Sequence, residues 1–197
     1  MLLGQIENLF AVYAELEEQM AQFKRVARID CLSKCQRCCE TAGSVEASPF
    51  EMLPLSIHLW EKGKAEPFLE QLMKVDPEGP CILLNRDPAL SSKGGCRYYS
   101  LRPLICRLFG FSAISDKYGN PKIALCKPLK ELNPEIEDRI NERIQEGLKV
   151  PVIPHFSRQV AFIHPNLGKD LYSINYSLRQ ALEIVGYRMQ FQKEPRT

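Results

Sequence analysis

Apolar residues recur every three or four positions over the first 27 residues of the chain, which is the repeat of an amphipathic α-helix. Because this repeat is also close to a coiled-coil heptad, the helix either packs on the protein's own core or forms a homodimer. Its length of about three and a half heptads favours packing on the core. The stripe consists of Leu2, Ile6, Leu9, Tyr13, Leu16, Met20, Phe23 and Ala27.

Several later segments also have the features of helices. Ser48, followed by a proline and by Glu51 three residues later, forms a capping box, which predicts a helix from Pro49 to about Lys62. Asn133-Pro134-Glu135 resembles a second helix start, with an apolar stripe behind it. Further helices are predicted over residues 65–74, 156–162 and 169–189, and Ser100 is expected to cap a short helix that runs through Cys106.

Little of the chain has the pattern of β-structure. Residues 111–114 and 122–126 are predicted to form a hairpin around Tyr118-Gly119-Asn120, and the apolar run 81–84 is predicted as a short strand before a loop over 85–95. The predicted fold class is mainly α, a helical domain with a small β-hairpin or irregular cysteine-rich metal-binding insert. We expect an N-terminal amphipathic helix over 1–30, a cysteine-cluster metal-binding domain over 31–130 and a C-terminal helical region over 131–197 that packs on it.

Composition and charge exclude several function classes. Hydrophobic residues make up 45% and charged residues 25% of the chain, as in ordinary globular proteins. A net charge of +2 gives no indication of nucleic-acid binding. The chain shows no export signal and no apolar run long enough to span a membrane, so the expected location is the cytoplasm. In that reducing compartment metal binding is favoured over disulfide bonding for the cysteines.

The cysteines are the main candidates for chemistry. Cys31, Cys35, Cys38 and Cys39 lie within nine residues, and Cys81, Cys96, Cys106 and Cys126 follow singly. The first four sulfurs would share one face of a helix, and in a loop they would still be close enough to surround one metal. Thiolates are ligands for zinc and for iron–sulfur clusters. Eight sulfurs suffice for two four-sulfur sites, or for one cluster with thiols to spare, and the adjacent pair of cysteines suits two nearby sites or a cluster.

This cysteine pattern resembles the CxxCxxCC family of zinc- or iron-chelating proteins. The resemblance rests on Cys35-Gln-Arg-Cys38-Cys39, on Cys81 and on the segment from Cys96 to Cys106, and it covers residues 31–127. Gln36-Arg37 stands where the family has a glycine, which affects the local turn. The resemblance implies metal chelation by all eight cysteines. Some proteins that share the pattern are flagellin lysine methylases, which extends the implied function to redox or group-transfer chemistry.

Positive charge near the cysteines is the second candidate feature. Arg97, Arg102 and Arg107 are predicted to bind the cofactor, since a four-thiolate site has a net charge of about −2, and they could equally bind an anionic substrate. Histidines are scarce, so mixed Cys/His zinc sites are not indicated. An iron–sulfur cluster is favoured over zinc as cofactor. The alternative function is a structural zinc module that presents a helical surface to a protein partner. The partner, protein or small molecule, and any catalytic residue stay open.

Overall fold

A computed structural model describes residues 2–32, 35–41, 45–85 and 95–193. Most of these residues are helical, which confirms the predicted mainly α class. In chain order the elements are α1 (Leu2–Ala27), α2 (Arg37–Glu40), β1 (Glu46–Ala47), α3 (Pro49–Glu61), α4 (Ala65–Leu72), a 3-10 turn (Tyr99–Leu101), α5 (Leu104–Leu108), β2 (Ser112–Ser115), β3 (Pro121–Ala124), α6 (Lys127–Leu132), α7 (Ile136–Gln145), α8 (Ile153–Ile163), α9 (Pro165–Gly168), β4 (Tyr172–Ser173) and α10 (Ile174–Lys193).

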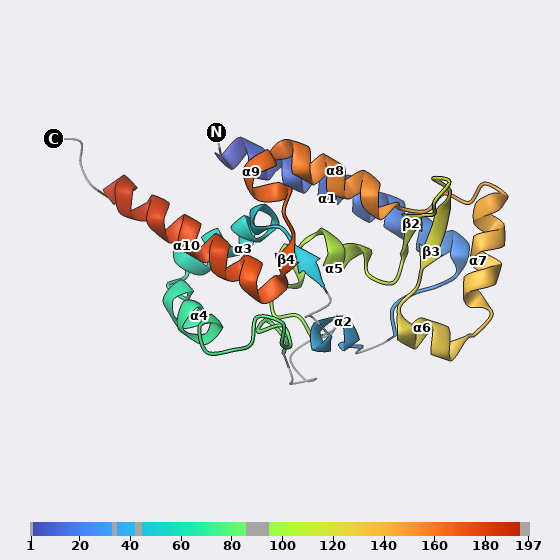
Figure 1. Ribbon diagram of the computed structural model, residues 1–197, viewed down its shortest axis with the longest axis horizontal. Helices are drawn as coiled ribbons and strands as arrows, with labels where there is room; N and C mark the ends of the chain where they lie inside the picture. The colour runs from blue at the N-terminus through green and yellow to red at the C-terminus, as the bar shows by residue number, and fades with distance from the viewer. Residues whose placement is uncertain (1, 33–34, 42–44, 86–94, 194–197) are drawn as a thin grey trace.

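Helix α1 has the predicted bounds and packs on the protein's own core. Its stripe is buried from Ile6 to Ala27, with Leu9 and Leu16 fully inaccessible to solvent, and Leu2 is partly buried. Helix α8 lies alongside it, and the Gln5 side chain donates a hydrogen bond to the carbonyl of Ile163 at 2.9 Å (Figure 1). The predicted homodimer through α1 stays a prediction, and it would have to use a different face, because the stripe is already covered.

Helix α3 begins with the predicted capping box. The Ser48 side chain accepts from the backbone of Glu51, and the Glu51 side chain accepts from the backbone of Ser48. Pro54 lies inside the helix without ending it, and a left-handed Gly63 follows the helix end. Helix α10 packs along α3, where Trp60 Nε1 donates to the carbonyl of Leu182 at 2.9 Å. Together with α4, these two helices lie at the end of the molecule opposite the hairpin (Figure 1).

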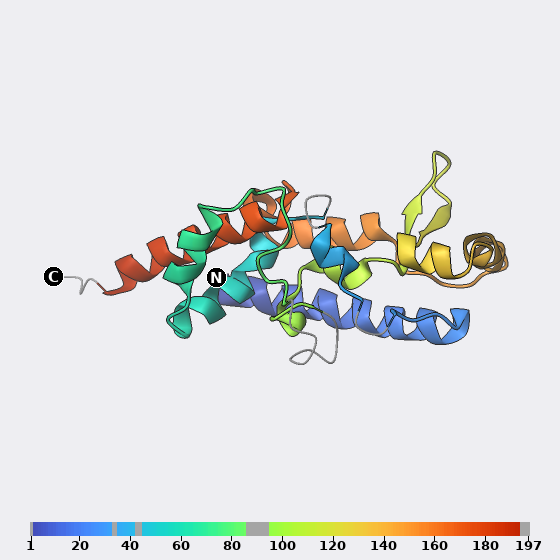
Figure 2. The ribbon, with the colours of Figure 1, turned by 90° about the horizontal axis from the view of Figure 1, so that it is seen from below.

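The β-structure consists of two small antiparallel pairs. Strands β2 and β3 form the predicted hairpin, with Ser112 opposite Ala124 and Ser115 opposite Pro121. The other pair, β1 with β4, was not predicted, since two-residue strands have no periodicity to detect. Figure 2 shows the hairpin projecting from the body of the molecule beside α6 and α7.

Three sequence predictions about local structure were wrong. Residues 81–84 form a turn closed by the Leu84 N–H on the Cys81 carbonyl at 2.9 Å, rather than a strand. Ser100 lies inside the 3-10 turn, and α5 starts only at Leu104, because Arg102 precedes a proline and is held in an extended conformation. Helix α10 begins at Ile174 rather than near residue 169, because Tyr172–Ser173 pairs with β1.

Residues from all three predicted regions contribute to one hydrophobic core. The core includes Leu16 from the first region, Leu108 from the second and Leu178 from the third. The predicted loop over 85–95 falls largely outside the described residues. Among the helices that the structure describes, none has the length and apolar character needed to cross a bilayer.

Candidate metal centre

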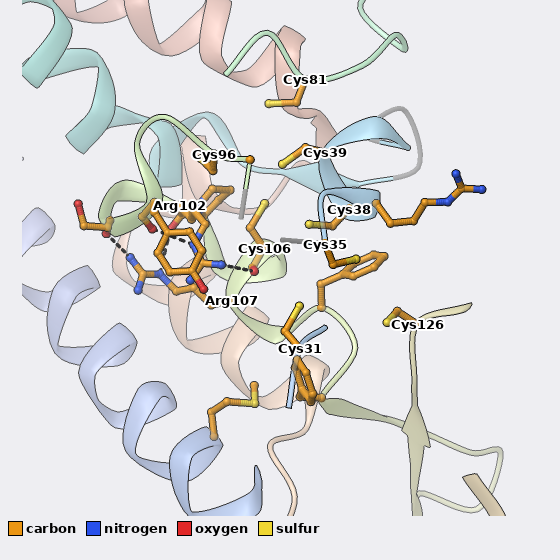
Figure 3. A pocket seen from close by; sticks show the side chains of 18 of the residues that line it. Cys31, Cys35, Cys38, Cys39, Cys81, Cys96, Arg102, Cys106, Arg107 and Cys126 are labelled. Atoms are coloured by element: carbon orange, nitrogen blue, oxygen red, sulfur yellow. Dashed lines mark hydrogen bonds between the residues drawn. The ribbon is translucent and has the colours of Figure 1, made fainter. Parts of the chain in front are cut away.

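All eight cysteines line one cavity of about 700 Å³. The cavity lies between α1, α2 and α5, and Figure 3 shows the cysteine side chains around it. Six of the cysteines are partly exposed, whereas Cys81 is buried and Cys31 is exposed. Residues separated by almost a hundred positions in the sequence are therefore brought to one place by the fold.

The first four cysteines come from a loop and from one short helix. Cys31 and Cys35 lie in the loop after α1, where the Cys35 N–H donates to the Leu32 carbonyl at 3.1 Å. Cys38 and Cys39 lie on α2, a single turn of helix. Of the two conformations considered from sequence, the structure therefore has the loop for Cys31 and Cys35 and the helix for the adjacent pair.

Backbone hydrogen bonds hold Cys39, Cys81 and Cys96 next to one another. The Cys81 N–H donates to the Cys39 carbonyl at 3.0 Å. The turn that starts at Cys81 places Leu84 in an antiparallel bridge with Cys96. Three segments that are distant in sequence are therefore joined at their cysteines.

The last two cysteines belong to two short helices. Cys106 is on α5, and Cys126 is the N-cap of α6. Gly110 faces Cys126 with φ of +85°, and a Cβ atom at this glycine would lie 3.2 Å from the Cys126 sulfur. The backbone conformation thus favours glycine here, and a Cβ atom would crowd the neighbouring thiol.

Burial and mutual repulsion oppose ionisation of most of the metal-free thiols. Burial raises the pKa of Cys31, Cys96, Cys106 and Cys126, and it raises that of Cys81 to about 12. Cys38 is different, because a hydrogen bond from the Cys39 thiol lowers its pKa while raising that of Cys39. A bound metal cation would stabilise the ionised form of these thiols, because its positive charge offsets their negative charge.

The three predicted cofactor-binding arginines are placed differently. Arg102 lines the cavity, where its guanidinium stacks 3.4 Å from the ring centroid of Tyr99 and donates to the Cys106 carbonyl at 3.1 Å. Its positive charge lowers the pKa of Cys38, Cys96 and Cys106 as a secondary contribution.

Arg107 also lines the cavity, but its contacts are mainly structural. It forms an ion pair with Glu17, donates to the carbonyls of Ser100 and Arg102, and lies over the Tyr13 ring. Arg97 does not belong to the residues that line the cavity. Arg102 is therefore the arginine whose position best suits the predicted role.

Part of the cavity wall was not identified from sequence. Met20 and Lys24 from α1, Tyr98 beside the 3-10 turn, and Phe111 after α5 all line it. Met20 was predicted only as part of the core stripe, and no sequence signal separated it from the other core positions. The wall thus combines thiols and apolar or aromatic side chains with charged groups, of which Arg102 has no carboxylate partner among the described contacts.

The donors of the cavity suit a metal, but its space exceeds what one ion needs. Every cysteine is a free thiol, and thiolate is a soft ligand. A zinc ion and sulfur ligands at about 2.3 Å define a sphere of only about 50 Å³, so a single ion leaves most of the cavity free. Among the described residues, no three His, Cys, Asp or Glu side chains already form a group that could hold a metal ion. Binding would therefore require the sulfurs to move closer together.

The comparison with protein families assigns the chain to a class. Residues 30–130 match the family model CxxCxxCC, which is described as "Putative zinc- or iron-chelating domain". The chain belongs to this family, as the cysteine pattern indicated. The matched segment contains all eight cysteines. Neither the curated proteins nor the solved structures include a significant match.

Proposed function

We propose that the cavity binds an iron–sulfur cluster through cysteine thiolates and supports redox or group-transfer chemistry in a reducing, cytoplasmic setting. The observation that carries the proposal is that eight thiols from positions 31 to 126 line a single cavity. Eight sulfurs exceed the four that one structural zinc ion uses. Iron–sulfur clusters are held by cysteine thiolates, and when bound they supply electron transfer.

The surroundings of the thiols also favour a cluster. Leu16, Met20 and Phe111 add apolar surface to the lining of the same cavity. Solvent exclusion and hydrogen bonds around the ligands are the means by which proteins tune the potential of a cluster. Arg102 supplies one positive charge beside Cys38, Cys96 and Cys106, which offsets part of the negative charge of bound thiolates.

The size of the cavity leaves room for a substrate next to the metal. About 700 Å³ is in the range of small-molecule sites. Tyr98 and Tyr99 provide aromatic surface on one side, and Lys24 reaches the wall from α1. These groups would orient a small molecule against the thiol-bound metal, which is the arrangement that group transfer requires.

A structural zinc module is the second candidate, and one observation favours it. The cysteines come from separate segments, so metal binding would cross-link the loop after α1 to α2, α5 and α6. Such a module would leave its outer helices available to a protein partner, and Phe162 on α8 is 82% exposed. In this case removal of the metal should unfold the cysteine-rich half of the chain.

Purification without oxygen, followed by assay of iron, zinc and acid-labile sulfide, separates the two candidates. The proposal predicts a brown protein that contains iron and sulfide in similar amounts and whose visible absorbance falls on reduction. A colourless protein with stoichiometric zinc and no iron would overturn it in favour of the zinc module. The same preparation exposed to air should lose iron and sulfide together, since both belong to one cluster.

A further inference from the structure

We infer that the eight cysteines form two adjacent four-sulfur sites, which divide the cavity into a buried and an accessible part. This inference rests on the proposed metal binding, but not on the identity of the metal. The inner quartet is Cys39, Cys81, Cys96 and Cys106. The outer quartet is Cys31, Cys35, Cys38 and Cys126.

The inner quartet is defined by the backbone. The Cys81 N–H on the Cys39 carbonyl and the bridge of Leu84 with Cys96 fix three of its members relative to one another. Cys106 faces them from α5, and Arg102 donates to its carbonyl. In Figure 3 these four cysteines lie together in one part of the cavity.

The members of the outer quartet come from short segments that are separate in sequence. Cys31, Cys35 and Cys126 lie in another part of the cavity in Figure 3, with Cys38 between them and the inner quartet. Cys126 is positioned by Gly110, and its carbonyl accepts from the N–H of Leu129 at 3.1 Å. This set comes from the loop after α1, from α2 and from the start of α6.

Cys38 adjoins both sets in Figure 3, because it lies between the inner quartet and the other members of the outer quartet.

The adjacent pair on α2 explains how two sites can share one short helix. Consecutive residues on a helix point about 100° apart, so Cys38 and Cys39 can each serve a different centre. Because the two cysteines are consecutive on one turn of helix, the two sites would be adjacent. Assigning Cys38 to the outer set gives four sulfurs to each site, the number that zinc and the common iron–sulfur clusters take.

The two sites should differ in access. Cys81 of the inner quartet is buried and Cys31 of the outer quartet is exposed, whereas the other three members of each quartet are partly exposed. Metal in the outer quartet should therefore exchange with a chelator faster than metal in the inner quartet. The outer centre is then the one that a small molecule or a protein partner can reach.

The test compares the total iron and zinc per chain in two double variants of the full chain, C31S/C126S and C81A/C96A, with the wild type. We expect each variant to lose part of the metal, and the two retained amounts to add up to the wild-type content. The wild type should release metal to a chelator in a fast and a slow phase, and C31S/C126S should lack the fast phase. Ser115→Ala, on the exposed side of β2, should keep all of the metal.

Two results would overturn the division into two sites. Complete loss of metal from C31S/C126S would indicate a single shared centre, and unchanged metal content would show that the outer quartet is not a site. Because Cys31 is exposed, this variant should fold even if the inner variant does not, and circular dichroism checks this. A wild-type protein that binds neither iron nor zinc would instead refute the proposed function.

Discussion

Replacement of Glu51 by glutamine probes the contact that links the core to the metal cavity. Glu51 is 4% exposed, and its carboxylate accepts from the Ser48 N–H at 2.9 Å and from the Leu104 N–H at 2.7 Å. Leu104 is the first residue of α5, which carries Cys106. The carboxylate therefore joins the start of α3 to the start of a cavity wall.

The size of the expected loss in unfolding free energy follows from the hydrogen-bond donors around the carboxylate. One oxygen accepts from the Ser48 N–H and the other from the Leu104 N–H, so in either orientation the amide NH₂ of glutamine faces one backbone donor. An unsatisfied buried N–H costs about 1–3 kcal/mol, and bonds to a charged acceptor are the stronger ones. Burial raises the pKa of Glu51, so removal of the charge offsets part of this loss. We expect Glu51→Gln to lower the free energy of unfolding by about 2 kcal/mol.

Urea denaturation of the metal-free protein followed by circular dichroism measures this loss. Glu18→Gln, on the exposed side of α1, is the matched control and should change the free energy of unfolding by less than about 0.5 kcal/mol. If Glu51→Gln also changed the free energy of unfolding by less than about 0.5 kcal/mol, the buried carboxylate would not be an essential hydrogen-bond acceptor.

The remaining predictions concern residues in the cavity. Gly110→Ala should cost about 1–3 kcal/mol in urea denaturation and reduce metal content, because it strains a left-handed backbone beside Cys126; wild-type values for both would contradict this. Arg102→Gln should bind metal less tightly than Arg102→Lys in a competition with chelator, since only lysine keeps the charge; equal affinities would argue against a charge effect. In the reduced, metal-free protein, Cys38 should be alkylated at a lower pH than Cys39, as measured by peptide mass spectrometry; the reverse order would contradict the hydrogen bond between them.

The helices with strong local signals were predictable from sequence. The stripe of α1 and the capping box at Ser48 each depend on residues only three or four positions apart, so a local pattern reveals them. The structure confirms both. Residues 81–84 were mispredicted because a short apolar run has no distinctive period. Its turn is fixed by the Cys39 carbonyl, a partner 42 residues earlier in the chain that no local pattern reveals.

The site was predictable in its chemistry but not in its geometry. The choice of cysteines as the chemical groups followed from their number and residue type alone. Their arrangement around the cavity depends on the contact between Cys81 and Cys39 and on the bridge to Cys96, which arise only in the folded chain. Arg97 and Arg102 were equivalent in sequence, because each lies within four residues of a cysteine, yet only Arg102 lines the cavity.

X-ray absorption spectroscopy at the iron and zinc edges of the protein purified without oxygen tests the central claim most directly. We predict a first coordination shell made only of sulfur, at about 2.3 Å, together with iron–iron scattering from a cluster. A shell that contains nitrogen or oxygen ligands, or a protein without bound metal, would contradict the claim that these cysteines form a metal centre.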